Sequence, residues 1–171
     1  MSRPDENKNE HPVVHPIPPV YRADSRILIL GSFPSVASRR DAFFYAHKQN
    51  RFWRVIAAVL QEPVPDSVEE KKRLLLSHGI ALWDVIGACT VNGSSDSSIG
   101  SVLPNDLSQI LTAAPVRYIF TNGKTADKYY RRFDLPLYDL PVVCLPSTSP
   151  ANAAKDTAAL IAAWSVIRNA L

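Results

Sequence analysis

Four short apolar segments, separated by stretches long enough to form helices, constrain the fold of this chain more than any other feature. The segments cover residues 26–31, 80–86, 116–120 and 142–145. Each is shorter than a typical helix and largely apolar, which is typical of strands buried on both faces of a sheet. Strands that alternate with helices form parallel sheets. The sequence therefore predicts an α/β fold, with three layers in the order α/β/α around a central four-stranded parallel sheet.

The stretches between these segments carry helix signals. Apolar residues recur at helical spacing from Phe52 to Leu60, and Pro63 follows to end that helix. Pro104 suits the first turn of another helix. We expect these further helices at about residues 66–78, 103–113, 123–133 and 153–170.

The first 25 residues differ from the rest of the chain. Five prolines between positions 4 and 19 prevent a regular helix there. We expect residues 1–25 to form a largely irregular lead-in, with residues 16–21 extended over the surface, and residues 26–171 to form a single domain.

Composition excludes several classes of protein. The sequence has no run of about 18 apolar residues, and its polar first ten residues lack the apolar core of a signal peptide. We therefore expect an intracellular, cytoplasmic protein without a membrane partner, located at the nucleoid in a bacterium or in the nucleus in a eukaryote. Cys89 and Cys144 are too few for a four-cysteine cluster or zinc ribbon, and we expect two buried, reduced thiols.

The net charge of +3 permits a polyanionic partner without requiring one. Basic residues gather in two groups, one between Arg39 and Arg54 and the other between Lys124 and Arg132. Each group could contact phosphates, or could form a solvated helix face. The sequence alone leaves both interpretations open.

Small, polar, turn-forming loops follow three of the four predicted strands. They cover residues 31–35, 121–124 and 146–152. Because the carboxyl ends of parallel strands meet at one edge of the sheet, ligands of such sheets bind there. We therefore expect the three loops to converge on one site, where the backbone N–H groups of the first turn can face a ligand.

The most specific pattern follows the first strand. Residues 31–35 read Gly-Ser-Phe-Pro-Ser, and an aromatic run at 43–45 leads into Ala-His-Lys-Gln-Asn-Arg-Phe-Trp at 46–53. Aromatic rings can form one wall of a flat pocket, and the Asn50 amide offers both a donor and an acceptor. Asn50 could instead only cap the helix that follows it, and Tyr45 could be an ordinary core residue.

This combination resembles the first motif of the uracil-DNA glycosylase superfamily, and it is most similar to the branch of hypoxanthine-DNA glycosylases. Residues 145–152 are similar to the second motif of that branch, and residues 83–85 and 93–96 match its middle segment. The resemblance extends from about residue 15 to the C-terminus. It implies a monofunctional DNA glycosylase that flips a deaminated base, hypoxanthine or uracil, out of the DNA and hydrolyses its N-glycosidic bond in base excision repair.

The resemblance also implies roles for individual residues. Asn50 is implied to be catalytic, either by orienting water or by hydrogen-bonding the leaving base. The implied base pocket comprises Gly31, Ser32, Phe33, Pro34, Ser35, Phe44, Tyr45 and Asn122. DNA contacts are implied for His47, Gly93, Ser94, Lys124, Ser147, Thr148, Ser149 and Asn152, although His47 could be a scaffold residue and Asn122 a turn residue. We expect no metal, no cofactor and no lyase step, and a monomer whose partner is DNA with a deaminated or mismatched base.

Two positions depart from the superfamily pattern. Phe33 stands where the uracil enzymes carry Asp or Asn, and Leu145 stands where other branches carry His or Asn. Neither side chain can activate water or stabilise an oxyanion. The last loop also lacks a bulky apolar wedge, so Pro150 or Asn152 would have to replace the flipped nucleotide. These departures leave two other interpretations open: a mismatch-type uracil glycosylase, and a DNA-binding protein of the same fold with weak or no catalysis.

Overall fold

The computed structural model describes residues 12–90 and 99–171. Its strands are β1 (Val13–Val14), β2 (Ile27–Gly31), β3 (Ile80–Asp84), β4 (Ile86–Thr90), β5 (Gly100–Pro104), β6 (Tyr118–Asn122) and β7 (Val142–Leu145). Its helices are α1 (Val36–Asp41), α2 (Phe52–Leu60), α3 (Val68–Ser77), α4 (Ser108–Leu111), α5 (Lys124–Phe133), α6 (Leu135–Tyr138) and α7 (Thr157–Trp164), and a 3₁₀ helix (Ser165–Ala170) follows α7.

The main sheet contains four parallel strands in the order β3-β2-β6-β7. Strand β2 lies in the interior of this sheet, and all five of its residues are buried. Such burial on both faces explains why the strand is apolar throughout rather than alternating. The predicted four-stranded parallel sheet is confirmed.

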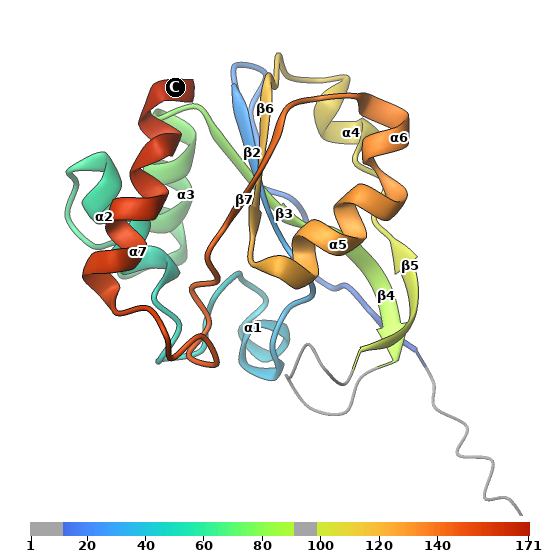
Figure 1. Ribbon diagram of the computed structural model, residues 1–171, viewed down its shortest axis with the longest axis horizontal. Helices are drawn as coiled ribbons and strands as arrows, with labels where there is room; N and C mark the ends of the chain where they lie inside the picture. The colour runs from blue at the N-terminus through green and yellow to red at the C-terminus, as the bar shows by residue number, and fades with distance from the viewer. Residues whose placement is uncertain (1–11, 91–98) are drawn as a thin grey trace, which may run out of the picture.

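Helices cover both faces of this sheet (Figure 1). α2, α3 and α7 lie on one side, and α4, α5 and α6 lie on the other. The core between the layers includes Phe52 and Trp164, whose rings meet edge to face 5.8 Å apart. The predicted three-layer α/β/α arrangement is confirmed.

A second, antiparallel sheet differs from the prediction. The segment expected to form one strand at 80–86 changes partners at Val85: β3 stays in the main sheet, while β4 pairs with β1 and β5. The change occurs because the Val85 N–H donates to the Gly31 carbonyl and the Val85 carbonyl accepts from Asn105. One apolar run therefore contributes a strand to each of the two sheets.

Two predicted helices are shorter than expected. The helix expected at 103–113 begins only at Ser108, where Asp106 Oδ1 accepts the Ser108 N–H, because residues 100–104 form β5. Pro104 is tolerated at the end of this edge strand because it has no N–H to leave unpaired. The last helix begins at Thr157, after Asp156 caps it, and tightens into a 3₁₀ helix from Ser165.

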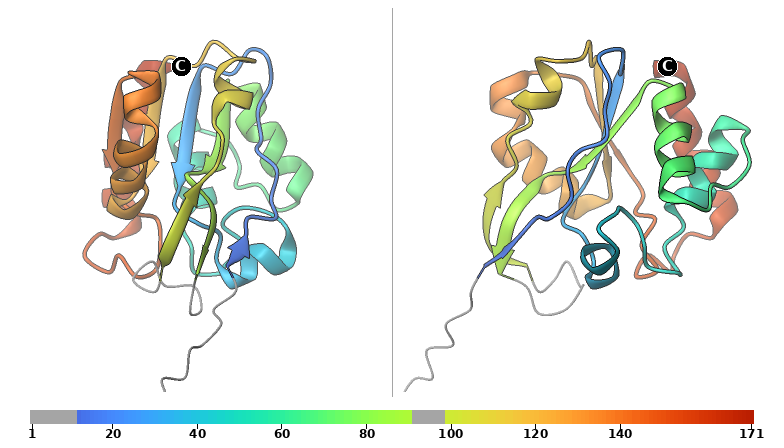
Figure 2. Two further views of the ribbon diagram at one scale, coloured as in Figure 1. Left: turned by 90° about the vertical axis from the view of Figure 1, so that its right-hand side faces the viewer. Right: turned by 180° about the vertical axis from the view of Figure 1, so that it is seen from behind.

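The described part of the lead-in, residues 12–25, packs into the domain. Figure 2 shows this segment in blue, crossing the sheet beside β3. Val20 exchanges two backbone hydrogen bonds with Leu82, and Ile17 and Val20 are buried. Residues 16–21 are thus extended, as expected, but they supply core side chains rather than lying only over the surface. Within the described ranges, none of the helices has the length and apolar character needed to cross a membrane.

Candidate active site

A cavity of about 950 Å³ opens at the carboxyl edge of the main sheet. The loops that follow β2, β6 and β7 line it, at the lower edge in Figure 1. The residues expected at the site that line this cavity are Gly31, Ser32, Phe33, Pro34, Ser35, Phe44, Tyr45, His47, Asn50, Asn122, Lys124, Ser147, Thr148, Ser149 and Asn152. Gly93 and Ser94 lie outside the described residues. The expected convergence of the three loops is confirmed.

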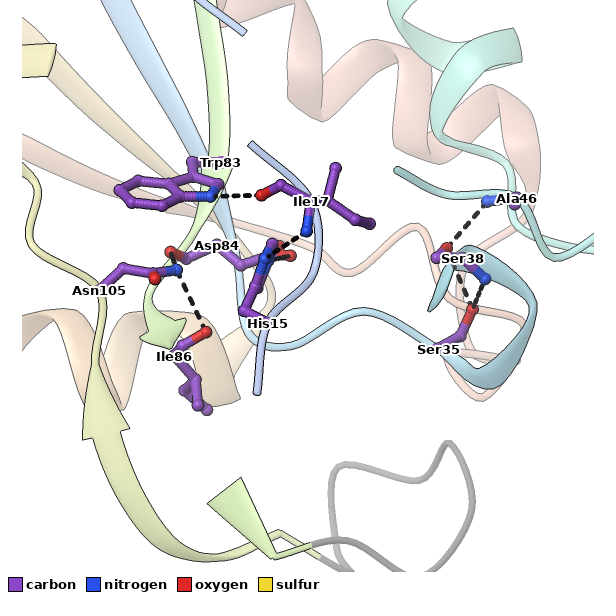
Figure 3. Close-up of polar contacts among 9 residues, drawn as sticks. All are labelled: His15, Ile17, Ser35, Ser38, Ala46, Trp83, Asp84, Ile86 and Asn105. Atoms are coloured by element: carbon purple, nitrogen blue, oxygen red, sulfur yellow. Dashed lines mark hydrogen bonds and ion pairs between the residues drawn. The ribbon is translucent and has the colours of Figure 1, made fainter. Parts of the chain in front are cut away.

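The turn after β2 is tied to the aromatic loop by two serines. Ser35 Oγ accepts the Ser38 N–H at 3.1 Å and so caps α1. The buried Ser38 Oγ in turn accepts the Ala46 N–H at 3.1 Å (Figure 3). These bonds fix the position of Tyr45, which directly precedes Ala46, relative to the turn.

Tyr45 forms an aromatic wall of the cavity. Its ring stacks on Phe52, with centroids 4.1 Å apart and an interplanar angle of 22°. Its backbone has a φ of 54°, in the left-handed region, which costs a residue with a side chain about 1–2 kcal/mol. The stack on Phe52 and the adjacent hydrogen bond of Ala46 hold this conformation in place.

The side-chain amide of Asn50 has a fixed orientation. Its Oδ1 accepts the Phe52 N–H at 2.9 Å and the Thr148 hydroxyl at 2.9 Å. A backbone N–H can only donate, so the atom facing Phe52 must be the amide oxygen. The Asn50 Nδ2 group has no hydrogen-bond partner among the described residues. Asn50 therefore presents a donor to the cavity, while its oxygen already accepts hydrogen bonds from the first N–H of α2 and from Thr148.

Asn122 and Thr148 connect the loops after β6 and β7. The Thr148 N–H donates to Asn122 Oδ1 at 3.0 Å, and Asn122 Nδ2 donates to Thr148 Oγ1 at 3.0 Å. Thr148 is fully buried, and its hydroxyl, which accepts from Asn122, donates in turn to Asn50 Oδ1. Thr148 therefore has no free side-chain hydrogen-bonding group for the expected contact with DNA, and its paired polar atoms instead hold the two loops together.

Arg51, one of the basic residues that could have contacted phosphates, instead holds the last loop. Its guanidinium donates to the carbonyl oxygens of Ser149, Asn152 and Lys155, and its N–H donates to the Thr148 carbonyl. The start of α2 is thereby joined to the loop between β7 and α7. Sequence reasoning missed this role because the partners are backbone atoms about 100 positions away.

The other residues expected to contact DNA differ in which of their hydrogen-bonding groups are still available. Ser147 Oγ and Ser149 Oγ each accept a backbone N–H two residues ahead, which leaves their hydroxyl protons available to donate. The Asn152 amide is already bonded to the Ser147 carbonyl. His47 is exposed, and its Nδ1 accepts the Gln49 N–H, in keeping with a scaffold residue.

Charged and titratable groups around the cavity are few. Lys124 lines the cavity and is exposed. The positive charge of Arg40 in α1 is instead paired with Asp41, and their hydrogen bond lowers the pKa of the Asp41 carboxyl. Cys144, which also lines the cavity, is exposed rather than buried as expected, and partial desolvation of its thiol raises the pKa. Cys144 therefore stays protonated near neutral pH and offers no thiolate nucleophile.

A buried pair that had no predicted role, His15 and Asp84, lies at the cavity. His15 Nε2 donates to Asp84 Oδ2 at 2.7 Å (Figure 3). Asp84 also lines the cavity, beside Gly31. Asp84 could have been recognised as a candidate site residue, because it is a carboxylate at the end of a buried strand. Nothing local marks His15, which reaches Asp84 only because the lead-in packs against β3 and β4.

Comparison with known proteins agrees with this geometry. A family model described as the uracil DNA glycosylase superfamily matches residues 18–168. The chain is 39% identical, over 79% of its length and 85% of the relative, to the hypoxanthine DNA glycosylase of Methanosarcina acetivorans. It is 35% identical, over 66% of its length and 72% of the relative, to the hypoxanthine DNA glycosylase of Methanosarcina barkeri.

A solved structure is similar as well. It is the solution NMR structure of a protein from Methanosarcina acetivorans described as a candidate uracil DNA glycosylase, and it superposes with a TM-score of 0.74 at 32% identity. The match covers 89% of this chain and 96% of that one.

Proposed function

Because this chain belongs to the uracil DNA glycosylase superfamily and is a DNA glycosylase, we propose that it releases a deaminated base, hypoxanthine before uracil, from DNA. The reaction is hydrolysis of the N-glycosidic bond, without a lyase step. Two relatives that carry the name hypoxanthine DNA glycosylase support this order of preference.

The target base leaves the DNA stack and enters the cavity. Enzymes that act on a base inside a duplex must extrude it, at a cost of a few kcal/mol that is lowest for a mispaired base. Stacking on an aromatic ring returns about 1–3 kcal/mol. Tyr45 supplies this ring: it lines the cavity, and its stack on Phe52 holds it in position, which supports the proposal.

Asn50 stabilises the departing base. As the glycosidic bond breaks, negative charge develops on the base, and a fixed N–H donor aimed at that charge lowers the barrier. The fixed orientation of the amide favours this role for Asn50 over accepting a hydrogen bond from water, because its oxygen already accepts two. This preset orientation is the observation on which the proposal mainly rests.

The surrounding loops bind the DNA backbone. The free hydroxyl protons of Ser147 and Ser149 donate to phosphate oxygens, and exposed Lys124 adds a positive charge. Pro150 is exposed at the cavity and fills the gap left by the flipped nucleotide, since the Asn152 amide is engaged within the loop. His47 supports the turn before Asn50.

The test is a base-release assay on oligonucleotides that carry hypoxanthine, uracil or xanthine, each opposite the four normal bases. Strand cleavage is measured with and without alkali after incubation. We expect cleavage that depends on alkali and is fastest for hypoxanthine. Release of uracil alone would instead favour a mismatch-type uracil glycosylase.

A binding control separates the remaining interpretation. Release of no base, combined with intact binding to the same oligonucleotides, would favour a DNA-binding protein of the same fold. Strand cleavage without alkali would contradict the absence of a lyase step.

A further inference from the structure

Hydrolysis at this site needs a group that accepts a proton from water, and the residues considered so far do not supply one. Asn50 presents a donor, and its oxygen already accepts hydrogen bonds from Phe52 and Thr148. Phe33 is apolar and cannot accept a proton. The proton acceptor must therefore lie elsewhere on the cavity wall.

Asp84 is the one carboxylate among the described residues that line the cavity. It ends β3 directly opposite Gly31, its register partner at the end of β2. Because Gly31 has no Cβ, Asp84 Oδ1 and the Tyr45 hydroxyl can both approach it; a Cβ there would collide with Oδ1 and lie 2.8 Å from the hydroxyl. Oδ1 has no hydrogen-bond partner among the described residues, and it lies next to the stacking tyrosine.

His15 holds the other oxygen of Asp84. The Ile17 N–H donates to His15 Nδ1 at 3.2 Å, so the ring proton is on Nε2, which donates to Asp84 Oδ2 at 2.7 Å. Only 2% of the His15 side chain and 5% of the Asp84 side chain are exposed. The His15 ring also meets the rings of Phe33 and Trp83 edge to face, at 5.9 and 6.1 Å.

The other titratable groups on the cavity wall are poorer proton acceptors. Lys124 and Lys155 are donors when charged. His47 uses Nδ1 to accept the Gln49 N–H, which leaves a protonated Nε2. Cys144 stays a thiol. Among the titratable groups of the described residues that line the cavity, Asp84 is therefore the best placed to accept a proton, through Oδ1.

We propose that Asp84 accepts a proton from the attacking water through Oδ1, and that His15 is the positioning residue that fixes the carboxylate for this step. The inference rests on the proposed function. The water oxygen forms a bond to C1′ of the sugar while the bond from C1′ to the base nitrogen breaks, and its electron pair stays on the base. The water proton passes to Asp84 and then to solvent or the released base, so that one water is consumed for each base released.

The experiment measures single-turnover base release by the full chain and, separately, its affinity for DNA that carries a stable abasic analogue. Asp84→Asn keeps the size of the side chain and an oxygen for His15, but it cannot take up the proton. We expect a rate about 100-fold or more lower, since general base catalysis contributes about 10²–10⁴-fold, and an affinity within about threefold of wild type. Asp24→Asn, at an exposed site just before the start of β2 and so at the opposite end of that strand from Gly31 and the cavity, serves as the control with an unchanged rate.

A second pair of variants leaves Asp84 in place and so remains informative if Asp84→Asn does not fold. His15→Phe removes the donor and should lower the rate at least about tenfold, whereas His15→Gln keeps an N–H donor and should recover most of it. If His15 acted only through its size, both variants would lose the same rate. That result would overturn the role of His15 as the hydrogen-bond donor to Asp84.

The outcomes separate this inference from the proposed function. Wild-type rates for a folded Asp84→Asn, or for both His15 variants, would overturn the inference while base release by wild type still supports the proposed function. Absence of base release by wild type would overturn the proposed function, and this inference with it.

Discussion

The Thr148 hydroxyl donates to the side-chain oxygen of Asn50 at 2.9 Å, although the two residues are 98 positions apart. The same hydroxyl oxygen accepts from Asn122, so one buried threonine joins the loops after β6 and β7 to the segment that precedes α2. The orientation of the Asn50 amide is therefore set by the far end of the chain. Because Thr148 is fully buried, its influence on the cavity runs through the hydrogen bond to Asn50.

The first prediction concerns that hydroxyl. Thr148→Val has nearly the same shape, but it leaves Asn122 Nδ2 without its acceptor and Asn50 Oδ1 with one donor fewer. We expect base release at least about tenfold slower, because a buried unsatisfied polar group costs roughly 1–3 kcal/mol and Asn50 loses one of the two hydrogen bonds that hold its amide in place. Thr148→Ser keeps the hydroxyl and is the matched control, so equal single-turnover rates for the two variants would contradict this role.

The second prediction concerns Arg51, whose side chain donates to three carbonyl oxygens of the last loop. Arg51→Gln should lower the melting temperature by several degrees, since hydrogen bonds from charged groups contribute about 1.5–3 kcal/mol and 1 kcal/mol shifts the midpoint by about 2–4 °C. The loop at 146–156 should also become more sensitive to protease. Arg54→Gln removes an exposed arginine from the same helix and should change neither measurement.

The third prediction is a pH dependence of stability that originates away from the cavity. Burial, with a contribution from Asp106, raises the pKa of Asp134 to about 7. Because the folded pKa lies above the ordinary value of 3.8, the folded state binds the proton more tightly than the unfolded state. The stability from this group is thus fully present below about pH 4 and is lost as the pH rises to about 7.

The corresponding variant is Asp134→Asn, which is neutral at every pH. Above pH 7 its free energy of unfolding should exceed that of wild type by up to roughly 4 kcal/mol, since one pKa unit corresponds to about 1.4 kcal/mol. At pH 4 the two proteins should be similar in denaturant unfolding. Asp139→Asn changes an exposed carboxylate nearby and should follow the wild-type curve.

The fourth prediction concerns salt. Lys124→Gln should weaken DNA binding to a similar extent for every base tested and should reduce the slope of log K against log salt by about 1, because a phosphate contact releases about one counterion. Lys72→Gln changes an exposed lysine on α3 that does not line the cavity, and it should leave the slope unchanged. A base-dependent effect of Lys124→Gln would contradict its assignment to the phosphate backbone.

Much of the fold could be predicted from the sequence because its signals are local. The strands of the main sheet are apolar runs buried on both faces, and parallel order forces their carboxyl ends to meet. The position of the cavity and most of its lining therefore followed from three polar loops. A role of Asn50 at the start of α2 was likewise an alternative in the sequence: its oxygen binds the Phe52 N–H, although Arg51 rather than Asn50 occupies the N-cap position.

The rest depends on contacts between distant segments. The small sheet of β1, β4 and β5 was missed because one apolar run continues from β3 into β4, and only the partner strands reveal the change. Thr148 was assigned to the DNA because a Ser/Thr-rich loop does not indicate which hydroxyl turns inward. The bond between His15 and Asp84 spans 69 positions, so neither residue alone indicates the pair.

The central claim is that Asn50 acts through a preset N–H donor, and Asn50→Asp tests it most directly. Aspartate keeps the oxygen that accepts from Phe52 and Thr148, but it replaces the donor with a second acceptor beside the charge that develops on the base. In single-turnover assays on hypoxanthine-containing DNA, we predict a loss of about 100-fold or more, as for removal of an oxyanion-hole donor, with Asn50→Ala equally impaired. An Asn50→Asp enzyme that releases the base at the wild-type rate would contradict the account.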